Sequence, residues 1–141
     1  MRTFVNNDIY NSLPADLKNG IIDTTVVSSH GSEDSSNFTS TDKLYLLAPT
    51  EIYSDWTSSS GSNYDTTKDL TRQLDYYKKE GVTTSNYSKA IKMYNSSASR
   101  WWLRSASSSD IVPFYYVWMT GDSGNNGASA AYGVSVAFRL G

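Results

Sequence analysis

Apolar residues recur along this chain at two different intervals, one typical of helices and one typical of strands. Helical spacing appears first near the N-terminus, where Phe4, Val5, Ile9 and Leu13 follow one another at near-helical intervals. Pro14 ends the pattern, because proline cannot continue a helix that precedes it. The sequence therefore predicts a short helix over residues 4–13.

The strongest helical signal lies in the middle of the chain, over residues 67–80. Leu70 and Leu74 lie on one face of this segment, and Gly81 follows where a left-handed cap belongs. Residues 87–94 repeat the i, i+3, i+4, i+7 stripe and predict a further helix. We therefore expect two main helices.

Strand-like segments occupy much of the remaining chain. Residues 21–27 are rich in branched side chains and predict a strand, and residues 44–47 predict a short buried strand. The polar residues 28–41 between them predict a long loop.

Towards the C-terminus the apolar spacing changes to two. Residues 114–119 predict a strand, residues 121–127 predict a glycine-rich turn, and residues 134–140 alternate apolar and polar positions. We expect the two strands to form a hairpin or meander. The strand 114–119 has no polar face, so it is either covered on both sides or leaves one face for a ligand. The fold class predicted is α+β, in a single domain over residues 1–141.

Composition excludes several classes of function. The net charge is -2 with no basic block, which argues against nucleic-acid partners. No apolar run approaches the roughly 20 residues of a membrane helix, so we expect no membrane insertion. The absence of cysteine excludes disulfides, thiolate catalysis and cysteine-ligated metals.

Residues for catalysis are sparse, and we expect no enzymatic activity, no cofactor and no metal. The single histidine, His30, rules out most triads, and no phosphate loop, dinucleotide fingerprint or nucleophile elbow occurs. Carboxylate pairs such as Asp65 with Asp69, or Glu33 with Asp34, are interpreted as solvated surface rather than as a glycosidase pair.

Two segments have partial metal-site patterns. His30 with the acids at 33 and 34 is a candidate site, but a lone histidine in a serine-rich loop is typical of solvated surface. Residues 122–126 carry oxygen side chains at short spacing, yet lack the alternating acids and distal glutamate of a calcium loop. A plain turn is the favoured interpretation of that segment.

A structural frame is predicted from apolar segments that contain arginine. Arg104 and Arg139 lie in such segments, where a buried guanidinium needs carboxylate or carbonyl partners, so we interpret both as clamps. Trp101 and Trp102 present indole faces on which a sugar stacks, but their attachment to this segment makes at least one of them a core residue. Phe138 completes the predicted frame.

Several of these motifs together resemble a bacterial and phage domain family of uncharacterised function. They are Trp-Trp-Leu-Arg-Ser-Ala at 101–106, Phe-Tyr-x-Val at 114–117, Gly121, and Gly-Val-x-x-Ala-Phe-Arg at 133–139. Residues 1–7, 41–47 and 72–77 also look like that family, so the resemblance spans most of the chain. It implies that further strands lie upstream of Arg2, which would make this chain the C-terminal part of a longer protein.

The C-terminal ending is similar to the C-type-lectin-like fold of formylglycine-generating enzymes and of variable proteins from diversity-generating retroelements. The resemblance implies two main helices against a twisted antiparallel sheet and a variable ligand-binding region over residues 105–132. Departures limit what is carried over. The cysteines of formylglycine-generating enzymes and the Glu-Pro-Asn, Gln-Pro-Asp and Trp-Asn-Asp signatures of calcium-dependent sugar binding are absent.

The leading hypothesis is therefore a non-enzymatic module that binds a protein or glycan receptor on a target cell, displayed on a virion or bacterial cell surface. Aromatic side chains mixed with small polar ones are typical of contact surfaces. The predicted contact residues are Ser109, Asp110, Ile111, Tyr116, Trp118, Met119, Asp122, Ser123, Asn125, Asn126 and Tyr132. The alternatives are a structural domain that forms homo-oligomers and, ranked last, a carbohydrate-processing enzyme.

Overall fold

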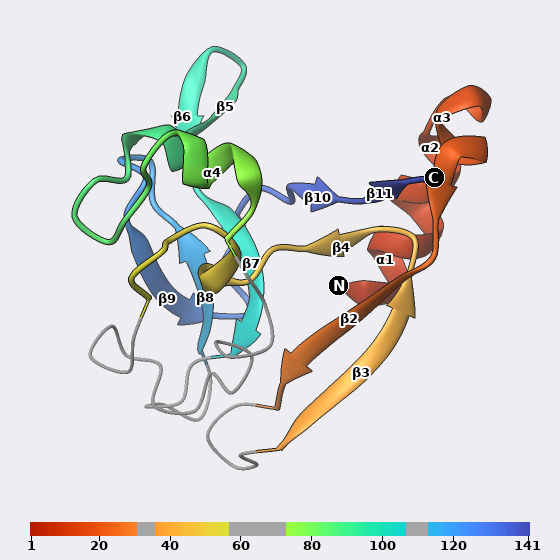
Figure 1. The fold of residues 1–141 in the computed structure, drawn as a ribbon, viewed down its shortest axis with the longest axis horizontal. Coiled ribbons are helices and arrows are strands. Elements are labelled where there is room, and N and C mark those ends of the chain that lie inside the picture. The colour runs from red at the N-terminus through yellow and green to blue at the C-terminus, as the bar shows by residue number, and fades with distance from the viewer. Residues whose placement is uncertain (31–35, 57–72, 107–112) are drawn as a thin grey trace.

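The structure is a computed structural model that describes residues 1–30, 36–56, 73–106 and 113–141 (Figure 1). Short strands dominate it, and every pairing between named strands is antiparallel. The helical elements are α1 (Arg2–Phe4), the π-helical η1 (Val5–Ile9), α2 (Tyr10–Ser12), α3 (Ala15–Gly20), the 3₁₀ turns η2 (Pro49–Glu51) and η5 (Ser88–Ala90), and α4 (Asp75–Lys79). The strands are β1 (Ile21–Ile22), β2 (Thr24–Ser29), β3 (Asn37–Asp42), β4 (Tyr45–Leu46), β5 (Lys92–Tyr94), β6 (Ser97–Ser99), β7 (Trp101–Ala106), β8 (Pro113–Val117), β9 (Ser123–Gly127), β10 (Val136–Ala137) and β11 (Arg139–Leu140).

The N-terminal helix is confirmed. Elements α1, η1 and α2 form one continuous helical segment, and Leu13 leaves it in an extended conformation directly before Pro14. Val5 is the buried residue of this segment. Among the described residues this is the one helical segment of seven or more residues, so the expectation of two main helices is wrong.

The central helix is much shorter than expected. In its described part, Leu74 is extended and caps α4, which begins only at Asp75. Residues 67–72 lie outside the described residues. Gly81 has φ +64°, which confirms the left-handed cap.

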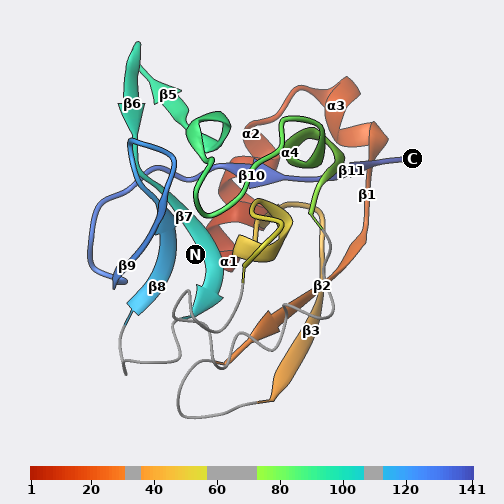
Figure 2. The same ribbon diagram turned by 60° about the vertical axis from the view of Figure 1, so that its left-hand side comes forward.

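The predicted helix over residues 87–94 is wrong. This segment contains the turn η5 followed by β5, which pairs with β6 in a hairpin. Asn95 and Ser96 between the strands have φ values of +48° and +64°, and two successive positive φ angles are what a tight hairpin turn requires. The hairpin projects from the body in both views (Figures 1 and 2).

Residues 28–41 are not one loop, because half of them belong to the β2–β3 hairpin, which is paired from Thr24 with Asp42 to Ser29 with Asn37. The strand predicted over residues 21–27 is divided between two strands. Ile21 and Ile22 form β1, which pairs with β11, and β2 begins at Thr24.

The last segment of the chain does not form a hairpin with β8, as the alternation suggested. Instead β10 pairs with β4, and β11 pairs with β1. The partner of β8 is β9, so residues 123–127, predicted as a turn, form the third strand of the β7–β8–β9 sheet. The strand prediction over residues 114–119 is confirmed for its first four residues.

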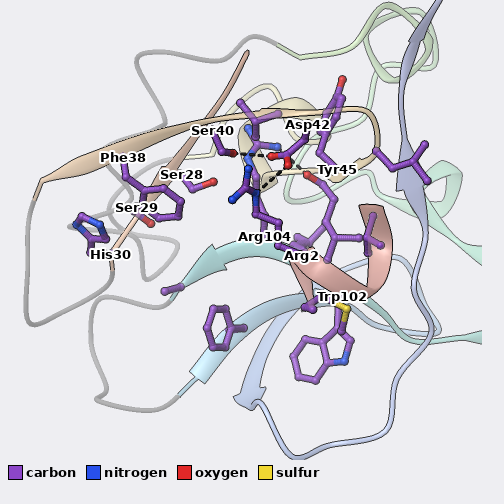
Figure 3. Close-up of a pocket in the computed structure, with 18 of the residues that line it drawn as sticks. Arg2, Ser28, Ser29, His30, Phe38, Ser40, Asp42, Tyr45, Trp102 and Arg104 are labelled. Carbon is purple, nitrogen blue, oxygen red and sulfur yellow. Dashed lines mark hydrogen bonds and ion pairs between the residues drawn. The ribbon is translucent and has the colours of Figure 1, made fainter. Parts of the chain in front are cut away.

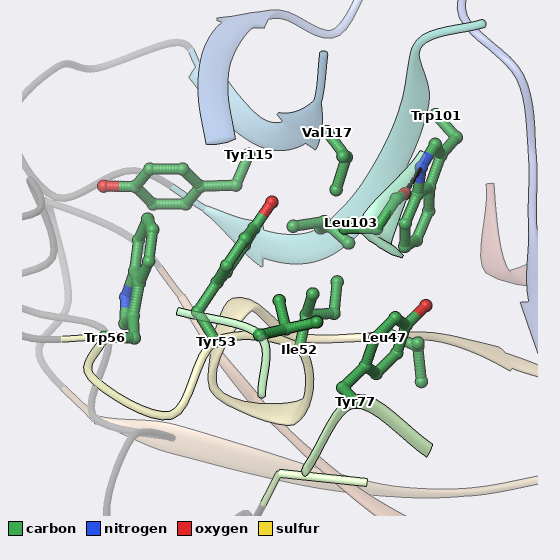
Figure 4. Packing of buried hydrophobic residues seen from close by; sticks show 11 residues of the cluster. Leu47, Ile52, Tyr53, Trp56, Tyr77, Trp101, Leu103, Tyr115 and Val117 are labelled. Atoms are coloured by element: carbon green, nitrogen blue, oxygen red, sulfur yellow. Dashed lines mark hydrogen bonds between the residues drawn. The ribbon is translucent and has the colours of Figure 1, made fainter. Parts of the chain in front are cut away.

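Two buried clusters lie on opposite faces of this sheet, because alternate residues of β7 and β8 point to opposite sides. The first core is packed from β7, β8, the segment after β4 and α4 (Figure 4). It contains Leu47, Ile52, Tyr53, Trp56, Tyr77, Val82, Ala90, Trp101, Leu103, Tyr115 and Val117. The second core contains Val5, Ile21, Leu44, Leu46, Trp102 and Tyr116. No helix in the described ranges is long and apolar enough to cross a bilayer.

Candidate functional site

The register of the β7–β8–β9 sheet brings together part of the predicted contact set, beginning with Tyr116 of β8 and the polar residues of β9. Tyr116 lies opposite Trp102 on one side and opposite Gly124 on the other. Residues directly opposite in neighbouring strands point to the same face. The face that carries Trp102, Tyr116 and Gly124 is called the recognition face below, and it is the face turned towards the second core.

Four aromatic rings form a contiguous aromatic cluster on this face: Trp102, Tyr116, Trp118 and Tyr132. The ring centroid of Tyr132 lies 4.7 Å from that of Trp102 and 4.6 Å from that of Tyr116, and Tyr116 lies 5.4 Å from Trp118. Trp102 and Tyr116 are buried, whereas Trp118 and Tyr132 are half-buried. The predicted contact residues include three aromatic ones, Tyr116, Trp118 and Tyr132. Tyr116 is buried beneath the other two and does not reach solvent.

Tyr132 reaches the cluster because its loop is fixed to the start of β7. The backbone N–H of Trp102 donates to the carbonyl of Gly133 over 2.9 Å, and the N–H of Gly133 donates to the carbonyl of Arg100, also over 2.9 Å. A side chain at Gly133 would lie 3.1 Å from that carbonyl, so a glycine allows this close approach. The loop thereby places the Tyr132 ring over Trp102.

Gly124 has the corresponding role under the other half of the cluster. A Cβ atom there would lie 2.5 Å from Nε1 of Trp118 and 2.8 Å from the hydroxyl of Tyr116. Both rings therefore rest directly on the backbone of β9, and the missing side chain provides the space for them.

Among the residues that the structure describes, Arg100 is the cation that stacks on these rings. Its guanidinium lies 3.9 Å from the ring centroid of Trp118 and 5.3 Å from that of Tyr132, which are cation–π distances. The Nε atom is buried and has no hydrogen-bond partner in the structure. A guanidinium held by rings and lacking an acceptor can still form charge-assisted hydrogen bonds with a ligand that brings one.

Polar groups border the cluster along β9. Asn126 donates from Nδ2 to the hydroxyl of Tyr132 over 2.7 Å, and both Asn125 and Asn126 are exposed. Burial first, and then the neighbouring Tyr132 hydroxyl, raise the pKa of Tyr116 above its ordinary value. Tyr116 thus remains a neutral phenol at physiological pH.

Three further predicted contact residues lie in the turn before β9 and at its first position. Met119 is exposed, while Asp122 and Ser123 are half-buried, and the side chain of Asp122 accepts a hydrogen bond from the Thr120 hydroxyl. No cluster of three or more His, Asp or Glu side chains suited to a metal ion occurs in the described part of the chain. Ser109, Asp110 and Ile111, the remaining predicted contacts, lie outside the described residues.

The two arginines expected as clamps have different environments. Arg104 donates from Nε to the Val27 carbonyl over 3.1 Å and from NH1 to the Leu46 carbonyl over 2.9 Å, and it forms an ion pair with buried Glu51. Arg139 is exposed at the end of the chain, so the expectation that it is a buried clamp is wrong. Its charge nonetheless acts on Tyr45: burial, and then Glu51, raise the pKa of that phenol, while Arg104 and Arg139 partly oppose the rise.

The other predicted frame residues lie in the interior. Trp101 is 2% exposed in the first core and donates from Nε1 to the Ala90 carbonyl over 3.2 Å, while Phe138 is half-buried against the second core. Burial of Trp101 and Trp102 leaves neither indole face free for a sugar. His30 stacks on Phe38 at 4.8 Å, and the residues at 33 and 34 lie outside the described residues. The carboxylate pair at residues 65 and 69 also lies outside the described residues.

Sequence reasoning missed Arg100 and the role of Gly124. Arg100 stands directly before the Trp-Trp pair, so an arginine flanking a buried strand was the available signal. Gly124 was assigned to a turn, and only the pairing of β9 with β8 shows that its missing side chain accommodates two rings.

These observations define a mixed α+β domain of mostly antiparallel strands with a partly exposed aromatic cluster on one sheet face. The chain belongs to the family described as a domain of unknown function, DUF6273, which matches residues 1–141. Searches of curated proteins and of solved structures found no significant match. The similarity to C-type-lectin-like folds therefore stays a prediction.

Proposed function

We propose that this chain is a non-enzymatic receptor-binding module with a C-type-lectin-like fold, displayed on a phage or bacterial surface. The observation that carries the proposal is the guanidinium of Arg100, which is held between two half-exposed aromatic rings and has a buried Nε without an acceptor. Arg100 as a whole is only half-buried, so its guanidinium can still donate charge-assisted hydrogen bonds to an acceptor that a receptor brings.

The surrounding residues fit contact with a large partner. Trp118 and Tyr132 offer rigid apolar area at low entropic cost, and rigid aromatics with arginine are the residues that dominate binding energy at protein interfaces. Asn125 and Asn126 add exposed amides that donate and accept directional hydrogen bonds. An acidic group on the receptor, whether a protein carboxylate or an acidic sugar, is the partner that Arg100 favours.

The same geometry supports diversification of residues 105–132 by a retroelement. In β9 the two exposed residues, Asn125 and Asn126, follow Gly124, the glycine under the rings, and neither belongs to a core, so substitution of Asn125 or Asn126 leaves both cores untouched. Long-read sequencing of the encoding locus in sibling isolates tests this part. The reverse transcriptase of such a retroelement rewrites adenine-containing codons, so a nearby reverse-transcriptase gene and changes restricted to adenines in codons 105–132 would support diversification. A locus that is identical in all isolates would exclude diversification, and the chain would then be a binding module of fixed sequence.

The binding function itself is tested with the isolated chain on a panel of intact bacterial cells. We expect saturable binding to some strains, with Trp118→Ala losing at least about 2 kcal/mol of binding free energy. Tyr76→Ala is the matched control, because Tyr76 is an exposed aromatic residue on α4, outside the cluster. Equal loss in both variants, or binding unaffected by Trp118→Ala, would remove the recognition face from the proposal.

A homo-oligomerising domain is the second candidate, and the β5–β6 hairpin favours it. The hairpin projects from the body (Figure 2). Met93 is 63% exposed and Tyr94 is 72% exposed on its opposite faces, so both faces offer apolar area to a second copy. A mass in sedimentation equilibrium that rises with concentration, and that returns to the monomer value in Met93→Ser/Tyr94→Ser, supports this candidate. A constant monomer mass up to high concentration excludes it.

A further inference from the structure

Two asparagines of this chain are followed directly by glycine, and the structure gives them different backbone environments. They are Asn19, followed by Gly20, and Asn126, followed by Gly127. The side-chain carbonyl of an asparagine can be attacked by the backbone nitrogen of the next residue, and a glycine leaves that nitrogen least hindered because it has no Cβ. Both asparagines are exposed. The backbone around each pair therefore decides which of them reacts.

At Asn126 the two reacting groups are already in contact. The backbone N–H of Gly127 donates to Oδ1 of Asn126 over 2.8 Å, so the side-chain amide is folded back onto the nitrogen of the next residue. On its other side the amide donates from Nδ2 to the hydroxyl of Tyr132 over 2.7 Å. The two bonds hold the amide by both of its polar atoms. The carbon between those atoms, Cγ, is thereby kept beside the Gly127 nitrogen.

The peptide between Asn126 and Gly127 lies where the sheet ends. Gly127 is the last residue of β9 and lies opposite Pro113, which has no N–H to donate to it. The Gly127 carbonyl instead accepts from the N–H of Ala130 over 3.1 Å, in the turn that follows. Local motion at the end of a ladder breaks few hydrogen bonds, so the nitrogen can adjust towards Cγ without opening the sheet.

Asn19 has the same neighbour in a more constrained backbone. Asn19 and Gly20 are the last two residues of α3. A helical N–H points towards the carbonyl four residues earlier, and so away from the side chain that precedes it. The carbonyl of Gly20 also accepts from the N–H of Gly141 over 3.1 Å. Reaction at Asn19 therefore requires that the end of α3 opens first.

We propose that Asn126 is a site of spontaneous modification, at which the Gly127 nitrogen attacks the side-chain amide and converts the asparagine into aspartate and isoaspartate. The bond from this nitrogen to Cγ forms, the bond from Cγ to Nδ2 breaks, and the proton lost by the Gly127 nitrogen leaves with Nδ2 as ammonia. Water then opens the cyclic imide at either carbonyl and leaves a carboxylate. No atom is oxidised or reduced, and water is the co-reactant.

The product places an anion on the recognition face, where the asparagine amide is neutral. A carboxylate at position 126 no longer donates a hydrogen bond to Tyr132, whose ring lies 5.3 Å from the Arg100 guanidinium. An acidic group on a receptor would then meet a like charge beside the arginine that attracts it. This consequence rests on the proposed receptor-binding function, whereas the modification itself does not.

Peptide mapping of the full chain by mass spectrometry, during incubation at mildly alkaline pH, tests the modification. Trypsin separates the two sites, because lysine and arginine enclose them in different peptides, 19–43 and 105–139. We expect conversion at Asn126 to be at least about tenfold faster than at Asn19, since α3 must open before Asn19 reacts. Gly127→Ala should slow conversion at Asn126 about tenfold, because the added methyl group hinders the attack. Gly127 does not have a positive φ angle, so alanine fits its backbone.

Two results decide the modification site. Conversion concentrated at Asn126, and slowed by Gly127→Ala while the rate at Asn19 is unchanged, supports the proposal. Equal rates at the two asparagines, an intact chain that does not convert, or a rate at Asn126 that Gly127→Ala leaves unchanged overturns it. The chain unfolded in urea is the control, because both sites should convert there at similar rates.

The effect on binding is measured separately, on the bacterial strains that the unchanged chain binds. We expect Asn126→Asp, which mimics one product, to bind at least about tenfold more weakly, because like charges now meet. Unreduced binding by Asn126→Asp would exclude an effect on the receptor contact and leave the mapping result as it stands. A chain that binds no strain would remove the receptor-binding proposal alone, since peptide mapping needs no receptor.

Discussion

The two faces of the β7–β8–β9 sheet carry alternate residues of the same strands, yet they differ in how completely they are packed. On the first-core face, Trp101, Leu103, Tyr115 and Val117 are each 2% exposed or less (Figure 4). On the recognition face, Trp102 and Tyr116 are buried. The rings of Trp118 and Tyr132 are only half-buried and contact Arg100. The second face also borders a pocket between the β2–β3 hairpin and β7 (Figure 3).

This difference separates stability from recognition within single strands. Complete burial on one face holds β7 and β8 in place, so the other face retains its geometry with fewer contacts of its own. Buried polar atoms without a partner occur on both sides, at Ser105 and Trp56 towards the first core and at Nε of Arg100 among the recognition-face rings, so the contrast between the faces is one of packing. The comparison predicts that equivalent substitutions on the two faces will have unequal effects on stability.

The largest expected effect comes from tryptophan replacement on the first-core face. Trp101→Ala should lower the free energy of unfolding by about 4 kcal/mol, through loss of a buried indole and formation of a cavity. Trp118→Ala should cost about 1–2 kcal/mol, because Trp118 is only half-buried. Urea unfolding followed by circular dichroism measures both. Equal losses would mean that the two faces contribute alike to stability.

Of the three strands that form both faces, β8 was predicted, because an aromatic and β-branched run identifies it without any tertiary information, as an apolar run identifies the short buried β4 elsewhere. The segment of β7 was predicted only as part of the structural frame, and β9 was predicted as a turn. The β5–β6 hairpin was not predicted. Tyr87, Ala90, Ile91 and Tyr94 have helical spacing, but the positive φ angles at Asn95 and Ser96 and the pairing with β6 outweigh that local preference. The Asn-Ser pair was the turn signal that spacing alone overlooked.

The polar strands were missed for a related reason. Strand β3 is mostly exposed, so its residues have the composition of a loop, and its partner β2 supplies the buried side chains of the hairpin. For the site, the sequence identified Tyr116, Trp118, Tyr132 and Asn126, which the structure brings together. Burial of Tyr116 depends on rings that arrive from a distant loop, and local sequence does not show such contacts.

The second prediction compares the two arginines that sequence analysis treated alike. Arg104→Met should destabilise the fold by about 3–4 kcal/mol, because it leaves the buried carboxylate of Glu51 without its charge partner. Arg139→Met should change stability by no more than about 0.5 kcal/mol, since Arg139 is exposed. Thermal and urea unfolding of the two variants provide the test. A large loss in Arg139→Met would show that it has the clamp role after all.

The third prediction uses two glycines on either side of the same turn. A Cβ at Gly121 would lie 2.2 Å from the carbonyl oxygen of Tyr87, and Gly121 has φ +97°, so Gly121→Ala should cost about 3 kcal/mol. Gly124→Ala meets only side-chain atoms of Trp118 and Tyr116, which can move, so about 1–2 kcal/mol is expected. Gly124→Ala should also alter the tryptophan fluorescence of the aromatic cluster. A reversed order of the two stability losses would contradict this account.

The smallest effect on stability is expected at Arg100, although its effect on binding should be large. Arg100→Met retains the apolar stem and removes a cation–π contact worth about 0.5–1 kcal/mol at a partly exposed site. It also removes a buried Nε that lacks an acceptor, which offsets part of the loss. We therefore expect urea unfolding to change by less than about 1 kcal/mol, while cell binding by the recognition face is lost. A stability loss as large as that of Arg104→Met would make Arg100 a structural clamp, and the guanidinium would no longer support a receptor contact.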